Sequence, residues 1–96
     1  MPARCPELDV YLRKIGAKCK YLSSRDSYWR QDGSRFCKVE TSDGETVVVF
    51  NELTLAKDGH RLPEAEINSK GWLKLRLVNA KRMEAAKRLA AELYNR

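Results

Sequence analysis

The stretch that predicts the fold most directly is RFCKVETSDGETVVVF, residues 35–50. Two runs of strand-forming residues flank an Asp-Gly dipeptide, and this arrangement is a strong short-range signal for a β-hairpin. The run VVVF at 47–50 is apolar on both faces, which favours a central strand covered on each side or packed against helices. A second Asp-Gly pair, at 32–33, precedes the stretch. We therefore expect a three-stranded meander over Tyr28–Gln31, Arg35–Thr41 and Glu45–Phe50.

The N-terminal part of the chain predicts a short amphipathic helix. Pro6 suits the first turn of a helix, and the apolar residues that follow it recur at helical spacing, at Leu8, Leu12 and Ile15. Gly16 is one candidate for the end of this helix. Alternatively, Cys19 extends the apolar stripe and the helix continues to Leu22, before the break at SSRDS.

The C-terminal part combines a strand and a second helix. The strand is WLKLRLV, residues 72–78, in which leucines alternate with Trp72, Lys74, Arg76 and Val78. From Ala80 to the end, good helix formers dominate, and Asn79 is the expected N-cap. The expected buried stripe of this helix consists of Met83, Ala86, Ala90 and Leu93. The stretch before the strand, residues 51–71, has no clear pattern, because Pro63 limits it to an edge or a loop.

The order of these elements predicts an α+β fold, with an antiparallel meander of three to five strands between an N-terminal and a C-terminal helix. A chain of 96 residues is expected to form one domain, residues 1–96, with one modest core. The composition of 43% hydrophobic and 33% charged residues is typical of a soluble globular protein. No apolar run approaches the roughly 20 residues that cross a bilayer, and the N-terminus lacks a signal-peptide pattern. We therefore expect no membrane contact and a cytoplasmic location.

The cysteines and the lone histidine offer little chemistry. Cys5, Cys19 and Cys37 are widely spaced, which does not suit a secreted disulfide framework, so reduced thiols are expected. With His60 they have the donor types of a zinc site, but the close CxxC pairs typical of structural zinc sites do not occur. No nucleophile, metalloprotease or phosphate-cradling motif occurs either. We expect no cofactor, no small-molecule substrate and no enzymatic activity.

Charge is segregated along the chain. Residues 13–38 carry eight basic and two acidic side chains, residues 39–68 two basic and seven acidic, and residues 69–88 seven basic and one acidic. If the two basic segments meet in the fold, they form a positive face suited to a polyanion. If they lie apart, the charge only favours solubility. A third possibility is that the acidic segment packs beside them and cancels the field through surface ion pairs.

Two aromatic residues stand beside basic ones. Trp72 shares its predicted strand face with Lys74 and Arg76, and a large indole needs a cover, either a packed element or a stacked nucleobase. In the strand predicted at Tyr28, alternation places Tyr28 and Arg30 on one face and Trp29 on the other. We interpret Trp29 as a core residue. Tyr28, Arg30 and Arg35 are then candidates for the positive surface.

The last helix carries charges that can pair with one another. Glu84, Arg88, Glu92 and Arg96 are four residues apart, so they can form ion pairs along one exposed face. The cations that this pairing leaves over are Lys81, Arg82 and Lys87. Those near the start of the helix can hold a phosphate together with the backbone amides there.

These observations predict a small basic domain that binds nucleic acid, mainly by its backbone and with limited base stacking. The residues expected to form the site are Lys70, Trp72, Lys74, Arg76, Lys81 and Arg82, supplemented by Tyr28, Arg30 and Arg35. The alternative is a compact protein-binding module or an inhibitor of a nucleic-acid-handling complex, of the anti-defence type that phages or mobile elements encode. The expected partner is therefore nucleic acid or an acidic protein surface.

Overall fold

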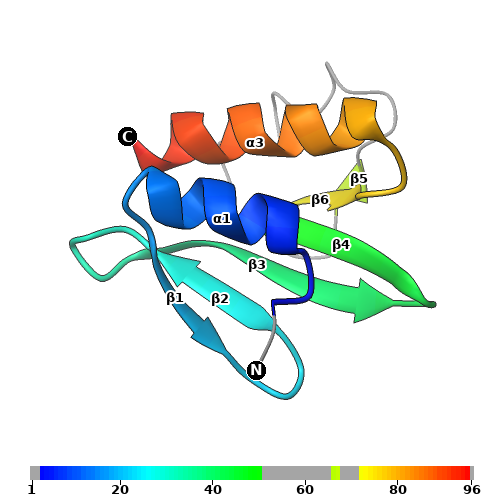
Figure 1. The fold of residues 1–96 in the computed structure, drawn as a ribbon, viewed down its shortest axis with the longest axis horizontal. Helices are drawn as coiled ribbons and strands as arrows, with labels where there is room; N and C mark the ends of the chain where they lie inside the picture. The colour runs from blue at the N-terminus through cyan, green and yellow to red at the C-terminus, as the bar shows by residue number, and fades with distance from the viewer. Residues whose placement is uncertain (1–2, 51–65, 68–71, 96) are drawn as a thin grey trace.

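The protein is an α+β fold in which two helices cover one face of an antiparallel sheet (Figure 1). The computed structural model describes residues 3–50, 66–67 and 72–95. The elements are α1 (Pro6–Lys14), β1 (Lys18–Tyr21), β2 (Asp26–Trp29), β3 (Arg35–Ser42), β4 (Glu45–Phe50), β5 (Glu66–Ile67), β6 (Leu73–Arg76) and α3 (Ala80–Tyr94). The strand order is β1-β2-β3-β4-β6-β5, so the two-residue β5 adds a sixth strand to the three to five expected. The predicted fold class is confirmed.

The first helix ends at Lys14, and the chain then turns into β1. Gly16 adopts a φ of 110°, in the left-handed region that favours glycine. A Cβ at this position would lie 2.7 Å from the hydroxyl oxygen of Tyr94, so any other residue would also clash with the end of α3. The alternative helix through Leu22 is wrong, because residues 18–21 pair with β2 instead.

The meander forms around the hairpin that the sequence indicates. Asp43 and Gly44 both have positive φ, at 53° and 79°, as the tightest β-hairpin turns require. The strand predicted at Tyr28–Gln31 begins two residues earlier, at Asp26. Its pairing with β3 is interrupted after Tyr28, so that Phe36 is an extra residue between the partners of Tyr28 and Trp29. This bulge lets Phe36 and Cys37, which are neighbours in the chain, both be buried.

The hydrophobic core lies between the sheet and the two helices. The last helix begins as predicted, because the side chain of Asn79 accepts a hydrogen bond from the backbone N–H of Arg82 at 2.9 Å. Its buried residues are Ala85, Ala86, Ala90 and Leu93, while Met83 is only partly buried. The sheet contributes Tyr28, Phe36, Cys37, Val39, Val48, Phe50, Leu73 and Leu75 to the same core. Neither α1 nor α3 is long and apolar enough to span a membrane.

Candidate nucleic-acid interface

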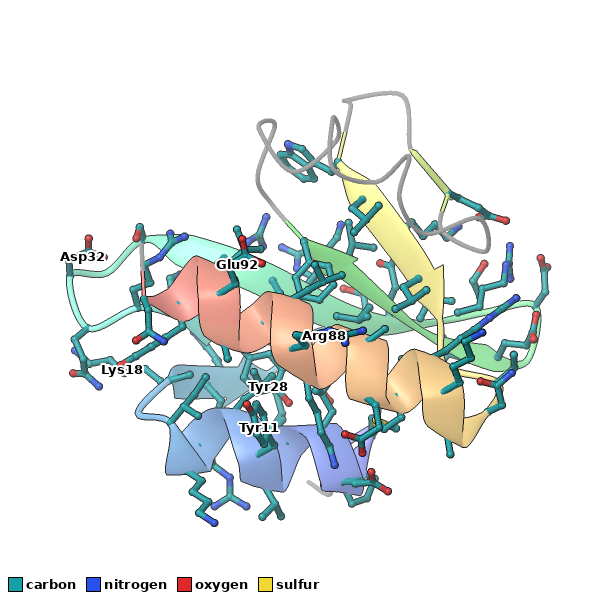
Figure 2. All side chains as sticks on the ribbon, turned by 90° about the horizontal axis from the view of Figure 1, so that it is seen from above. Tyr11, Lys18, Tyr28, Asp32, Arg88 and Glu92 are labelled. Carbon is teal, nitrogen blue, oxygen red and sulfur yellow. The ribbon has the colours of Figure 1, made fainter. Side chains whose placement is uncertain are left out.

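The face of the sheet that the helices cover, the helix face, holds Tyr28 in the core. Tyr28 is fully buried, and its hydroxyl donates a hydrogen bond to Oδ1 of Asp9 on α1 at 2.8 Å (Figure 2). Burial, followed by this hydrogen bond, raises the pKa of the Tyr28 phenol above its ordinary value. The interpretation of Tyr28 as a surface residue is therefore wrong. Because α1 packs over this side of β2, the half-buried aromatic residue of the opposite side is Trp29.

Arg30 stabilises the end of α3. Its Nε and Nη2 atoms donate hydrogen bonds to the carbonyl oxygen of Leu93 at 2.9 and 2.7 Å, and its guanidinium carbon lies 5.7 Å from the centre of the Phe36 ring. The last carbonyls of a helix lack partners within the helix, so a fork of donors is well suited to this place. Arg30 is thus directed to the protein itself, which removes it from the candidate phosphate contacts.

Arg76 and Arg82 also have partners within the chain. Nη1 of Arg76 lies 3.2 Å from Oε1 of Glu45, and its Nε lies 3.5 Å from Oε1 of Glu66. These carboxylates, Glu66 foremost, raise the pKa of the Arg76 guanidinium. Nη1 of Arg82 contacts the carbonyl oxygen of Arg76 at 3.5 Å. The acidic middle segment therefore neutralises part of the predicted site, which is the third arrangement that the charge pattern allowed.

A row of lysines crosses the opposite face of the sheet, the far face. Direct cross-strand partners run from Lys20 through Ser27, Lys38 and Val49 to Lys74, and partners of this kind point to the same side. Each of these residues alternates along its strand with core residues of the helix face. Neighbouring strands are about 4.8 Å apart, so the three lysines follow one another at intervals of roughly 10 Å. We call Lys20, Lys38 and Lys74 the lysine row.

The lysine row is only weakly paired. Lys20 is exposed, and Lys38 lies 3.8 Å from a carboxylate oxygen of Glu40. Lys74 is half-buried, and no carboxylate of the described residues forms an ion pair with it. Val49, between Lys38 and Lys74, is only 2% exposed. By register, the far face carries six cations against three carboxylates: Lys18, Lys20, Arg35, Lys38, Lys74 and Arg76 against Glu40, Glu45 and Glu66.

The remaining predicted residues do not form one surface. Trp72 precedes β6 and is half-buried, so its ring is neither in the open nor in the core. Lys81 is exposed at the start of α3, on the helix side of the sheet, and is therefore separated from Lys74 by the sheet. Arg35 is half-buried on β3 as the cross-strand partner of Trp29. Lys70 lies outside the described residues.

The charges of α3 pair differently from the sequence-based expectation. Lys87, expected to be unpaired, lies 2.8 Å from Oε2 of Glu7 on α1 and 3.6 Å from Oε1 of Glu84. The expected pair between Glu84 and Arg88 is replaced by this contact between the two helices. The side chain of Lys87 also lies 5.8 Å from the centre of the Tyr11 ring. Lys87 therefore joins α1 to α3, and the prediction that it is free for a partner is wrong.

Metal-binding chemistry and similarity to known proteins add no constraint on function. The three thiols are free, with Cys5 and Cys37 buried and Cys19 half-buried. His60 lies outside the described residues, and within these residues no group of three His, Cys, Asp or Glu side chains is placed to hold a metal ion. No protein-family model matches the chain, and neither the curated proteins nor the solved structures include a significant match. The far face is therefore judged on its own geometry.

Proposed function

We propose that the protein binds nucleic acid, chiefly through its phosphate backbone, and that the far face of the sheet is the binding surface. The observation that supports this proposal is the lysine row, in which Lys20, Lys38 and Lys74 come from three strands and share one side. Lysine acts as a mobile point charge that suits phosphate without reading sequence. The row replaces the predicted combination of β6 with the start of α3.

The charge balance of this face favours a weak contact that depends strongly on salt. Each neutralised phosphate releases counterions, and the affinity then falls with a logarithmic slope of about −0.7 to −0.9 per contact. Three lysines therefore predict a slope of about −2 to −3. Since Arg76 is already held by Glu45 and Glu66, we expect it to add little to this slope.

Base stacking is a secondary element of the proposal. Trp29 lies on the far face, with Lys18 and Arg35 as its cross-strand partners in β1 and β3. A half-buried indole flanked by cations can stack on a nucleobase while its neighbours contact phosphates. Trp29, which the sequence assigned to the core, therefore becomes an aromatic candidate beside Trp72.

The proposal is tested by measuring the fluorescence anisotropy of labelled oligonucleotides at increasing salt concentrations. We expect the double variant Lys38→Ala/Lys74→Ala to bind about tenfold more weakly than the wild type and to reduce the salt slope by about 2. The matched control is Lys81→Ala/Arg88→Ala, which removes the same charge from exposed positions of α3. Equal losses in the two double variants, or wild-type binding that is insensitive to salt, would contradict the proposal. Circular dichroism verifies that each variant is folded.

A further inference from the structure

The outer side of α1 carries an apolar stripe with one charge at each end. Glu7, Val10, Tyr11 and Lys14 are separated by three or four residues, so they lie on one side of the helix. Val10 is 57% exposed and is one of two large hydrophobic side chains that the described residues leave exposed. The Glu7 side chain is 60% exposed, and Lys14 is exposed at the other end. We call these four residues the α1 stripe.

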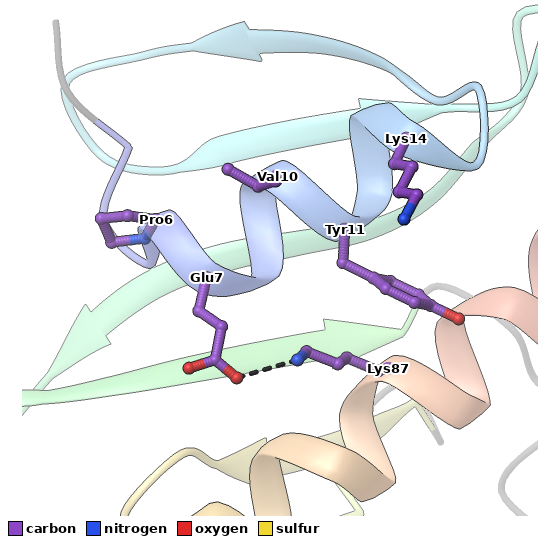
Figure 3. A pocket seen from close by; sticks show the side chains of 6 residues that line it. All are labelled: Pro6, Glu7, Val10, Tyr11, Lys14 and Lys87. Atoms are coloured by element: carbon purple, nitrogen blue, oxygen red, sulfur yellow. Dashed lines mark ion pairs between the residues drawn. The ribbon is translucent and has the colours of Figure 1, made fainter.

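A shallow hollow lies along this stripe. It measures about 510 Å³ and is lined by Pro6, Glu7, Val10, Tyr11, Lys14 and Lys87 (Figure 3). Lys87 reaches it from α3 and lies 2.8 Å from Oε2 of Glu7. The middle of the hollow is therefore formed by Val10 and the Tyr11 ring, with charged groups beyond them. An apolar side chain of a partner, flanked by charges, fits such a surface.

The order of the residues in the stripe makes it complementary to itself. If a second copy of α1 lies antiparallel across a two-fold axis between positions 10 and 11, Glu7 of each copy faces Lys14 of the other. Val10 of each copy then faces Tyr11 of the other. A two-fold contact uses the same patch twice, and this patch satisfies that condition in the antiparallel orientation only. A parallel orientation would place Glu7 against Glu7 and Lys14 against Lys14.

We propose that α1 forms an antiparallel contact with α1 of a second copy of this chain. The Glu7 carboxylate has two oxygen atoms, so it can accept a second cation beside Lys87. Lys14 forms no ion pair with any carboxylate of the described residues, so it is available to the second copy. A contact centred on one nine-residue helix is smaller than the roughly 1,200 Å² of a standard stable interface, so the dimer is weak and forms at high concentration.

This contact is independent of the proposed nucleic-acid surface. The α1 stripe lies on the helix side of the sheet, whereas the lysine row lies on the far face. Self-association therefore leaves both lysine rows of a dimer uncovered. Failure of either proposal leaves the other standing, because the two rest on different residues.

Sedimentation equilibrium of the full chain between about 10 µM and about 1 mM tests the proposed dimer. We expect the wild type to self-associate in this range and Val10→Lys to remain monomeric. Glu7→Lys and Lys14→Glu each place like charges at both ends of the contact, so each should weaken the dimer about tenfold. An equimolar mixture of these two variants should associate again, because the introduced lysine then faces the introduced glutamate.

The control variant is Lys20→Glu, which changes the charge of an exposed residue on the far face. It should associate as the wild type does. The proposal is overturned if the wild type stays monomeric at every concentration, or if the mixture associates no better than Glu7→Lys or Lys14→Glu alone. It is also overturned if Lys20→Glu weakens the dimer as much as these variants do. Circular dichroism of each variant separates a lost contact from a lost fold.

Discussion

The helix face of the sheet surrounds its charged groups with partners, whereas the far face leaves its lysines almost without them. On the helix face, the buried Asp9 carboxylate accepts hydrogen bonds from Tyr21, Tyr28 and Arg13, each at 2.8 Å. Asp26, also buried, accepts bonds from Nη1 and the backbone N–H of Arg4, at 2.6 and 2.8 Å. The lysine row has a single contact among the described residues, the 3.8 Å pair of Lys38 with Glu40.

This difference follows from the cost of removing a charge from water. A buried carboxylate destabilises the fold unless hydrogen bonds replace its hydration, so the partners of Asp9 and Asp26 are required by their burial. A lysine that reaches solvent has no such requirement. Charged groups on the helix face therefore serve stability, while those of the far face remain available for a partner. The predictions below probe this contrast, beginning with the largest expected effect.

Asp9→Ala should destabilise the protein most strongly among the changes considered. It leaves the Tyr28 hydroxyl buried without an acceptor, so we expect the free energy of unfolding to fall by about 3 kcal/mol. Urea denaturation followed by circular dichroism measures this change. Glu84→Ala, at an exposed position of α3, should stay within about 0.5 kcal/mol of the wild type. If the two variants are equally stable, the Asp9 network does not support the fold.

Arg30→Ala should cost about 1 to 2 kcal/mol, because the Leu93 carbonyl loses both of its charged donors and Phe36 loses its guanidinium neighbour. The same denaturation experiment detects the loss. Arg30→Lys keeps the charge but not the planar fork, so it should recover only part of the stability. Arg88→Ala, on the exposed side of α3, serves as the control. Full recovery in Arg30→Lys would show that charge alone is sufficient at this position.

Local sequence signals predicted the features that depend on a few neighbouring residues. The Asp43-Gly44 turn requires two positive φ values, and Asp-Gly is suited to them, so the hairpin could be recognised from its dipeptide. Asn79 lies directly before a run of helix formers, which identified the start of α3. The strand β1 was missed, although KCKY alternates as a strand does, because Cys19 also fits the apolar spacing of a helix.

Contacts between distant segments could not be predicted in this way. Arg30 and Leu93 are 63 residues apart, and nothing near Arg30 in the chain indicates that it binds the end of α3. The lysine row depends on the pairing of β4 with β6, which brings Lys74 beside Val49. Summed charge identified the two basic segments, but it could not show that Arg76 would meet Glu45 and Glu66.

Tyr28→Phe should produce a smaller loss, about 1 kcal/mol at neutral pH, and should alter the response to alkali. Because the pKa of the Tyr28 phenol is raised in the folded protein, its contribution is fully present below the unfolded pKa of about 10. Above that pH the unfolded chain releases the proton first, so stability falls as pH rises. Melting temperatures between about pH 8 and about pH 11 should fall less steeply for Tyr28→Phe than for the wild type. Identical slopes would mean that Tyr28 does not control the alkaline transition.

Changes within the lysine row should affect stability least. Lys38 and Lys74 are the direct cross-strand neighbours of the buried Val49, so their aliphatic stems are placed to cover it. Lys74→Met keeps an apolar stem and removes the charge, and its free energy of unfolding should stay within about 0.5 kcal/mol of the wild type. Lys74→Ala also shortens the stem and should be slightly less stable than Lys74→Met. If instead Lys74→Met is as destabilising as Arg30→Ala, the Lys74 charge has a structural role, and the contrast between the two faces does not hold at this position.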